Sequence, residues 1–204
     1  MIHIVDYGLG NIQAFINTYK RLGIETVRAR VAADLDGASK IILPGVGAFD
    51  HAMELLAASG MRARLDELVL VQHVPVLGIC VGMQILADSS EEGVGHGLGW
   101  VPGRVRSFAR TPASAALPMP HMGWNDVVAT PGCALFKGFE DDARFYFLHS
   151  YYFEAADPVH SLARAEYGFA FDCVVNKGNV FGVQFHPEKS HHWAPALLKN
   201  FAEV

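Results

Sequence analysis

The sequence predicts an α/β fold: a single domain over residues 1–204, with a central, mostly parallel mixed sheet flanked by helices and a smaller antiparallel sheet. Apolar residues make up 51% of the 204 residues and charged residues only 18%, which is enough apolar material for one substantial core. The N-terminal half alternates short apolar runs with segments of helical periodicity, the pattern of parallel βαβ units. In the second half, strand-like runs follow one another with turn residues between them, which predicts further strands without crossover helices.

The N-terminal half is expected to supply the parallel strands and their crossover helices. Residues 2–7 (IHIVDY) form an apolar run typical of a strand buried on both faces. Apolar side chains then recur at helical spacing from Ile12 to Leu22, and Gly23 ends the pattern. The same reasoning predicts strands at 25–29, 40–47 (broken at Pro44-Gly45) and 74–80, and helices at 52–59, 64–72 and 82–90.

The C-terminal half is expected to be mainly strands. Residues 110–120 (RTPASAALPMP) form a proline-rich loop, and residues 193–204 have the pattern of a closing helix. No internal repeat and no linker long enough to separate two domains is present in the sequence. The predicted strands are 99–108, 144–153, 161–168, 169–175 and 179–187.

Charge and cysteine usage exclude several function classes. The formal net charge is −5 and there is no basic stripe, so we expect no nucleic-acid partner. The N-terminus lacks the pattern of a secretory signal, and no run of about 20 apolar residues predicts a membrane span. The three cysteines, Cys80, Cys133 and Cys173, are odd in number and far apart, which indicates a cytoplasmic protein with free thiols.

Cys80 stands in an unusual frame. It lies between two glycines, Gly78 and Gly82, at the junction of a predicted strand and a predicted helix. This is the pattern of a nucleophile elbow with sulfur in place of the serine oxygen. Near a helix N-terminus the thiol pKa would be lowered, and the backbone N–H of Val81 would point toward a developing oxyanion. The alternative is a small apolar residue that fills the core.

His186 is the best candidate for the base that such a thiol needs. It ends the apolar run VFGVQFHPE, and Glu188 follows two residues later. We expect Pro187 to keep this segment extended, so that the two side chains share one side and Glu188 orients the imidazole. The alternative is a strand-end histidine bonded to backbone, with Glu188 on the surface.

Other chemistries fit the residues less well. A zinc deaminase signature needs cysteines after its histidine, and none follows His186. A metal site from His186, Glu188, His191 and His192 is conceivable, but adjacent histidines on one short segment rarely converge without other ligands. The Gly8 turn has Gln13 where a dinucleotide fingerprint has its third glycine. We therefore expect no metal and no cofactor.

Five segments together resemble the class I glutamine amidotransferases, and the resemblance covers nearly the whole chain. Within that family, the stretch PHMGWN (120–125) is most similar to the glutaminase subunits of imidazole glycerol phosphate synthase, which act in histidine biosynthesis. The resemblance implies a glutaminase in which Cys80, His186 and Glu188 release ammonia from glutamine through a glutamyl thioester. The segments are PGVG (44–47), GICVGMQ (78–84), PHMGWND (120–126), FLHSY (147–151) and GVQFHPEKS (182–190).

The same resemblance assigns the remaining site residues. The backbone at Val46 and Gly47 would complete the oxyanion hole opposite Val81, and a peptide between glycines can flip, which implies a switch controlled by a loaded partner. Each residue implied to bind the substrate also has a purely structural explanation. Gln84 could cap or solvate the first helix turns, Glu92 could be a surface charge, and the two residues at 150–151 could pack in an aromatic run. The residues implied to bind glutamine are Gln84, Glu92, Ser150 and Tyr151.

The resemblance also implies a partner, a (β/α)₈-barrel cyclase in a heterodimer that receives the ammonia. Trp124 would anchor the interface, although a half-buried core aromatic is the alternative. Residues 191–193 (HHW) are instead similar to paralogues that supply ammonia to sugar-amidating enzymes of bacterial surface polysaccharide synthesis, so the acceptor stays open. The residues implied to lie at or near the docking face are His121, Trp124, Asn125, Tyr146 and His149.

Overall fold

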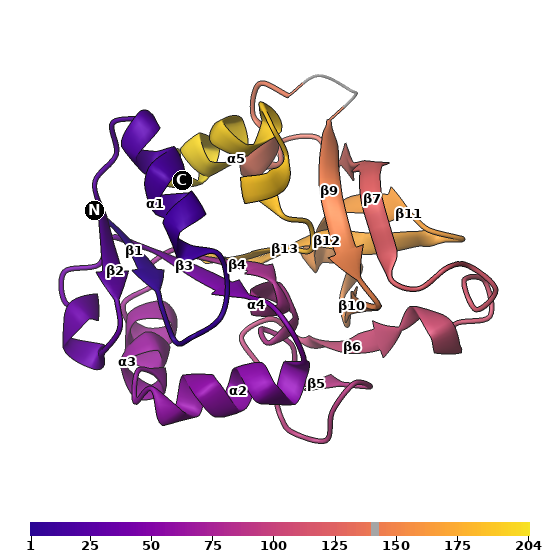
Figure 1. Ribbon diagram of the computed structural model, residues 1–204, viewed down its shortest axis with the longest axis horizontal. Coiled ribbons are helices and arrows are strands. Elements are labelled where there is room, and N and C mark those ends of the chain that lie inside the picture. The colour runs from indigo at the N-terminus through magenta and orange to yellow at the C-terminus, as the bar shows by residue number, and fades with distance from the viewer. Residues whose placement is uncertain (140–142) are drawn as a thin grey trace.

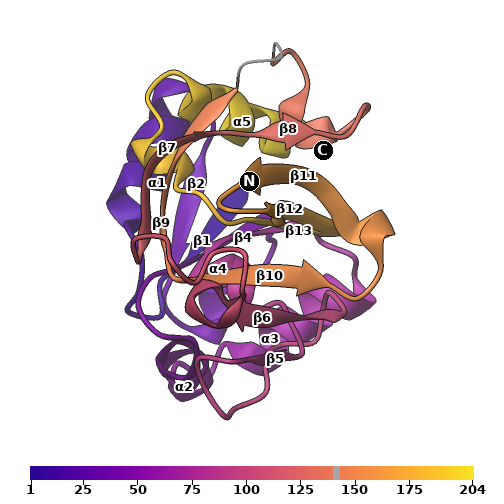
Figure 2. The same cartoon turned by 90° about the vertical axis from the view of Figure 1, so that its right-hand side faces the viewer.

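The computed structural model describes residues 1–139 and 143–204, and it has the predicted α/β architecture (Figure 1). One mixed sheet runs through both halves of the sequence in the order β2-β1-β3-β4-β13-β12-β10-β6-β5, and β11 and β8 branch from β12. The strands from β2 to β13 in this order are parallel, and the pairs β13–β12, β12–β10 and β10–β6 are antiparallel. A separate two-stranded antiparallel sheet, β7–β9, stands across its end (Figure 2).

The strands of the described chain have the following bounds: β1 Ile2–Val5, β2 Thr26–Ala29, β3 Lys40–Gly45, β4 Val76–Cys80, β5 Ser89–Ser90, β6 Gly103–Ser107, β7 His121–Asp126, β8 Val128–Ala129, β9 Arg144–His149, β10 Tyr151–Ala155, β11 Ser161–Glu166, β12 Ala170–Lys177 and β13 Val180–Val183. The α-helices are α1 Ile12–Arg21, α2 Phe49–Ala58, α3 Arg62–Asp66, α4 Val81–Gln84 and α5 Trp193–Glu203.

The helices cover the parallel half of the sheet on both faces: α1 and α5 lie on one side, and α2 and α3 on the other (Figure 1). The Asn11 side chain accepts a hydrogen bond from the Ala14 backbone N–H and so caps α1. The apolar stripe of α1, which includes Phe15 and Tyr19, faces the core, and the Tyr19 hydroxyl donates to the Leu198 carbonyl of α5. This packing places the carboxyl ends of β3, β4 and β13 side by side.

Three predicted elements differ from the structure. The predicted strand 144–153 is two strands, β9 and β10, which belong to different sheets and separate at Ser150. The predicted helix 64–72 spans α3 and a wider π-helical turn over Glu67–Val71. The predicted helix 82–90 is only the single turn α4, because the carbonyls of Ile85 and Ala87 accept hydrogen bonds from the 98–99 backbone.

Candidate active site

Cys80 lies on a strained turn between β4 and α4. Its backbone has φ 56° and ψ −115°, a conformation that a non-glycine residue rarely adopts and that is typical of functional sites. The flanking glycines are required by close packing: a Cβ on Gly82 would overlap the Leu43 carbonyl, and one on Gly78 would lie 2.5 Å from the Gly82 carbonyl oxygen. The geometry is that of a nucleophile elbow.

His186 reaches Cys80 from the neighbouring strand. β13 and β4 are parallel, with Val183 opposite Ile79, so the residues that follow both strands meet at one edge of the sheet. The His186 backbone N–H donates to the Tyr146 carbonyl, which ties this segment to β9. Sequence positions more than 100 residues apart are thus brought to one place by strand order.

His186 and Glu188 form a buried pair. Nδ1 of His186 lies 2.9 Å from Oε1 of Glu188, and each side chain is 4% exposed. Pro187 does not extend this segment as predicted; it starts a 3₁₀ turn over Pro187–Lys189, and the turn brings Glu188 back to the imidazole. Burial lowers the pKa of His186, but hydrogen bonds and negative charge from Cys80 and Glu188 outweigh it and raise the pKa well above its ordinary value.

A cavity of about 270 Å³ opens over Cys80 and His186. Cys80 is itself only 4% exposed, but it lines the cavity together with His186, so the sulfur has an approach for a small substrate. All the residues expected to form the oxyanion hole or to bind glutamine also line it. The lining residues are Val46, Gly47, Cys80, Val81, Gln84, Glu92, Pro120, Leu148, His149, Ser150, Tyr151, His186 and Lys189.

Two of the predicted substrate residues also have structural partners. Nε2 of Gln84 donates to the Tyr151 carbonyl at 3.2 Å and to Oε1 of Gln184 at 3.1 Å. Glu92 accepts a hydrogen bond of 2.8 Å from the Phe49 backbone N–H in the first turn of α2, so its carboxylate caps that helix. The alternative of Glu92 as a solvated surface charge therefore does not describe this structure.

Gln184 is near the nucleophile but was not among the predicted site residues. Its side chain is fully buried, and its Nε2 lies 3.9 Å from the Cys80 sulfur. A signal for it exists in the sequence: Gln184 and His186 are two residues apart in an extended segment, so they share one side.

The five predicted interface residues separate into two sets on the sheet β7–β9. Trp124 pairs with Tyr146 on the outer face, where Trp124 is 41% exposed. His121 and His149 pair on the inner face and are buried, because strand alternation points them inward. Their place at or near the docking face stays a prediction. Asn125 also points inward, and its Nδ2 donates to the Glu166 carbonyl.

The two inward histidines form a directed hydrogen-bond chain. Nδ1 of His149 lies 2.7 Å from the Tyr151 carbonyl, which can only accept, so this nitrogen carries the proton. His149 Nε2 then accepts from Nδ1 of His121 at 2.9 Å, and His121 Nε2 accepts from Asn125 Nδ2 at 3.2 Å. Both rings are neutral in this arrangement, and burial lowers the pKa of each.

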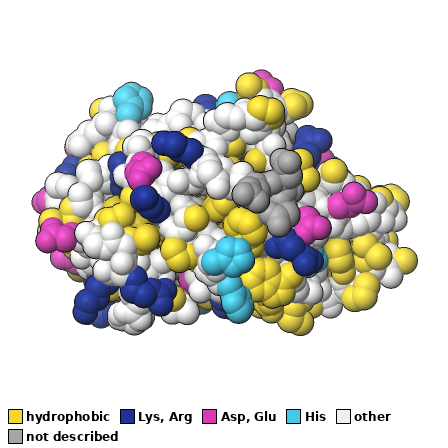
Figure 3. Space-filling model, turned by 90° about the horizontal axis from the view of Figure 1, so that it is seen from above, with side chains coloured by type: hydrophobic (Ala, Val, Ile, Leu, Met, Phe, Trp, Pro, Cys, Tyr) yellow, Lys and Arg dark blue, Asp and Glu magenta, His cyan; other side chains and the backbone are white. Residues whose placement is uncertain are grey.

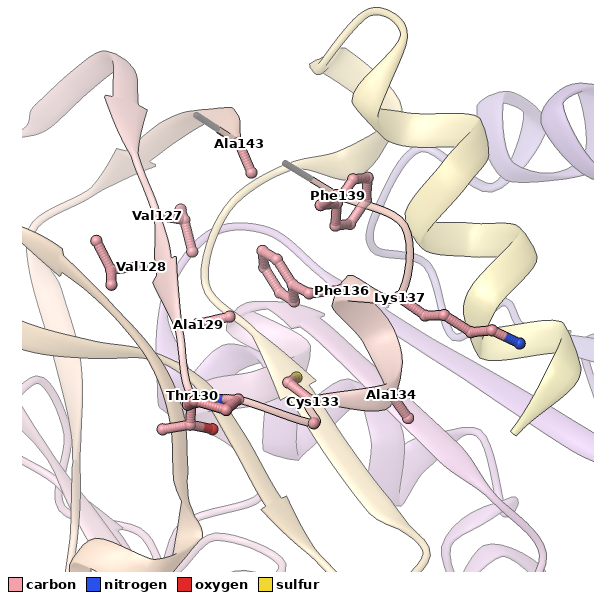
Figure 4. A pocket seen from close by; sticks show the side chains of 12 residues that line it. Val127, Val128, Ala129, Thr130, Cys133, Ala134, Phe136, Lys137, Phe139 and Ala143 are labelled. Atoms are coloured by element: carbon pink, nitrogen blue, oxygen red, sulfur yellow. The ribbon is translucent and has the colours of Figure 1, made fainter. Parts of the chain in front are cut away.

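A larger cavity of about 480 Å³ lies elsewhere, between β8 and the segment after it (Figure 4). Among the residues that the structure describes, its lining is mainly apolar, and Cys133 and Lys137 are the ionisable side chains in it. In residues 1–139 and 143–204, no cluster of histidine, cysteine and carboxylate side chains could hold a metal ion. On the face in Figure 3, acidic and basic side chains are interspersed.

No helix within the described part of the chain has the length and apolar character needed to cross a membrane.

Comparison with known proteins identifies the family. Residues 3–204 match the family model described as glutamine amidotransferase class-I. The chain is 64% identical to the imidazole glycerol phosphate synthase subunit HisH of Bdellovibrio bacteriovorus and 49% identical to that of Leptospira borgpetersenii, each over the full length of both chains. A solved glutamine amidotransferase with 22% identity has a TM-score of 0.76, covering 99% of this chain and 97% of its own. The chain belongs to the class I glutamine amidotransferase family.

Proposed function

We propose that this chain is the cytoplasmic glutaminase subunit of an imidazole glycerol phosphate synthase and hydrolyses glutamine to glutamate and ammonia. The observation that carries the proposal is that the elbow cysteine, Cys80, lines one cavity with His186, whose Nδ1 is paired with the buried Glu188. The relatives from Bdellovibrio and Leptospira carry that enzyme's name over their whole length. The whole of residues 1–204 would act as one glutaminase domain.

The first half of the reaction follows from the positions of these three side chains. The Cys80 thiolate attacks the carboxamide carbon of glutamine, and His186, held protonated by its two anionic neighbours, gives a proton to the leaving nitrogen. The C–N bond breaks, ammonia leaves, and a glutamyl thioester remains on the sulfur. Glu188 keeps Nδ1 of the imidazole protonated and the ring in place.

The second half reverses the proton transfers. The imidazole, now neutral at Nε2, takes a proton from water as the oxygen attacks the thioester carbon, and the C–S bond breaks to release glutamate. In both halves the tetrahedral oxyanion would be bound by the backbone N–H of Val81 and by the backbone at Val46 and Gly47, which line the same cavity. Gly47 has φ +92°, a conformation that favours glycine.

The partner is proposed to be a (β/α)₈-barrel cyclase, docked on the outer face of the sheet β7–β9. Met122 and Trp124 are exposed there, 60% and 41% respectively, and Tyr146 and Leu148 lie opposite them. Lys189 lies over the Tyr146 ring at 5.8 Å and also lines the active-site cavity. An exposed Trp that contacts Tyr146 and His191 suits an interface anchor, and Tyr146 connects it through Lys189 to the active-site cavity.

The decisive experiment uses the chain with its native partner. Cys80→Ala should abolish glutamine hydrolysis and leave the partner's synthesis from added ammonium intact. The control is Cys133→Ala, which removes a thiol outside the cavity and should keep glutaminase activity. Loss of ammonium-dependent synthesis in Cys80→Ala would contradict the proposed division of labour.

The acceptor is tested by asking which loaded partner stimulates turnover. The proposal requires faster glutamine hydrolysis when the barrel cyclase carries its nucleotide substrate, and slow hydrolysis by the chain alone. Stimulation only by a sugar-amidating enzyme would instead assign the chain to surface polysaccharide synthesis. Trp124→Ala should weaken the partner complex, whereas Val159→Ala, at a position 68% exposed elsewhere, should not.

A further inference from the structure

We propose that Gln184 is a catalytic residue: its side-chain amide donates a hydrogen bond to the Cys80 sulfur and stabilises the thiolate. This rests on Cys80 being the nucleophile of the proposed glutaminase. Nε2 of Gln184 lies 3.9 Å from the sulfur, at the outer limit of an N–H···S contact. The Gln184 side chain is fully buried, and Cys80 is 4% exposed, so water does not compete freely for either group.

The hydrogen-bond network determines which end of the Gln184 amide faces the sulfur. The Tyr151 carbonyl can only accept, so the Gln84 atom that contacts it, at 3.2 Å, is the amide nitrogen. The same nitrogen contacts Gln184 at 3.1 Å, and its second hydrogen needs an acceptor there, which is Oε1 of Gln184. The nitrogen of Gln184 is then left to face Cys80, and it can only donate.

The Tyr151 carbonyl, which determines the orientation of both amides, is held in place by a further hydrogen bond. The Tyr151 carbonyl also accepts from Nδ1 of His149 at 2.7 Å, so two donors meet at one oxygen. The Gln184 backbone N–H donates to the Cys173 carbonyl of β12 at 2.9 Å, which anchors the residue in the main sheet. An amide flip at Gln184 would place its NH2 group against the NH2 group of Gln84, so the donor orientation toward the sulfur is favoured by the network.

A donor in this position complements the histidine. The imidazole of His186 contacts the sulfur and is the group that moves protons, so it leaves its charged state during the reaction. The Gln184 amide does not ionise at neutral pH, so its N–H can stabilise negative charge on the sulfur throughout the reaction. A hydrogen bond to the charged form of a group favours that form, so loss of this donor should make the Cys80 sulfur less reactive toward an electrophile.

The test reads the thiol directly. The full chain is alkylated with iodoacetamide at pH 7, and modification of the Cys80 peptide is followed by mass spectrometry. Gln184→Met keeps side-chain length but removes the donor, so the rate of Cys80 alkylation should fall roughly 3- to 10-fold. Gln184→Asn keeps the amide but withdraws it from the sulfur, and it should also lower the alkylation rate.

The matched control is Gln13→Met on the exposed side of α1, which should leave the Cys80 alkylation rate unchanged. With the loaded partner present, Gln184→Met should lower kcat for glutamine and leave KM nearly unchanged. An alkylation rate that is unchanged or higher in both Gln184 variants would overturn the proposal, and the Asn variant alone decides if the Met variant fails to fold. A wild-type chain without partner-stimulated glutaminase activity would refute the proposed function but not this thiol readout.

Discussion

The buried pair His121–His149 makes a specific prediction about pH and stability. Burial lowers the pKa of His121 to about 4, and burial, opposed by the Tyr151 carbonyl and aided by nearby positive charge, lowers that of His149 to about 3. The hydrogen-bond chain explains why neither ring accepts a proton readily. The Asn125 Nδ2 group, a donor, lies at one end of the chain of hydrogen bonds, and the Tyr151 carbonyl, an acceptor, lies at the other. A proton added to either histidine would therefore place two donors against each other at one hydrogen bond of the chain.

The sign and size of the effect follow from linkage. The pKa of each histidine is lower in the folded chain than its unfolded value of 6.5, so below pH 6.5 the unfolded chain binds more protons. The contribution to stability is therefore fully present above pH 6.5 and is lost as the pH falls from 6.5 toward 4 and 3. Between pH 7 and pH 5, each ring is expected to remove about 2 kcal/mol from the free energy of unfolding.

The assay compares the wild type with His121→Gln, whose amide can replace one donor and one acceptor without titrating. The free energy of unfolding in urea is measured at pH 7 and pH 5 for each chain, and any loss of packing cancels in the difference between the two pH values. The wild type should lose about 2 kcal/mol more than the variant over this interval. Equal losses would show that His121 is not kept neutral by burial and would refute the reasoning.

Three other outcomes are expected. His186→Ala should reduce kcat for glutamine about 10- to 100-fold more than Glu188→Gln does, because the His186 imidazole transfers protons and Glu188 only orients it. Equal losses of kcat in steady-state assays would contradict this. Tyr7→Phe should leave the free energy of unfolding unchanged or raise it by up to about 1 kcal/mol, since the buried Tyr7 hydroxyl has no hydrogen-bond partner among the described residues. A clear loss of stability in urea unfolding would disprove that. Gly82→Ala should lower the free energy of unfolding by more than about 3 kcal/mol or prevent folding, because the added Cβ would overlap the Leu43 carbonyl. A variant that unfolds at the same temperature as the wild type would show that Gly82 is not packed this closely against Leu43.

Local patterns in the sequence were sufficient to predict the tight turn at Cys80 and the glycines around it, whereas the role of Cys80 as nucleophile stays a proposal. The glycines at 78 and 82 indicate that two backbone segments approach each other closely. An apolar run followed by residues of helical periodicity predicts a strand and its crossover helix. These features depend on sterics and periodicity over a few residues, so they can be read without coordinates. The proximity of Cys80 to His186 could be inferred because parallel strands end at one edge of a sheet.

Only the tertiary structure decided the features that depend on distant packing. The predicted helix after Cys80 ends after one turn because the backbone N–H groups of residues 98–99 donate hydrogen bonds to the carbonyls of Ile85 and Ala87. His121 and His149 are buried because strand pairing sets which side of β7 and β9 faces inward, and a one-residue change of register would have exposed them. Gln184 faces the sulfur because a carbonyl at Tyr151 and an amide at Gln84 orient it from other strands and turns. Amide orientation and side-chain burial arise from contacts between segments far apart in the chain, and short-range sequence patterns do not encode those contacts.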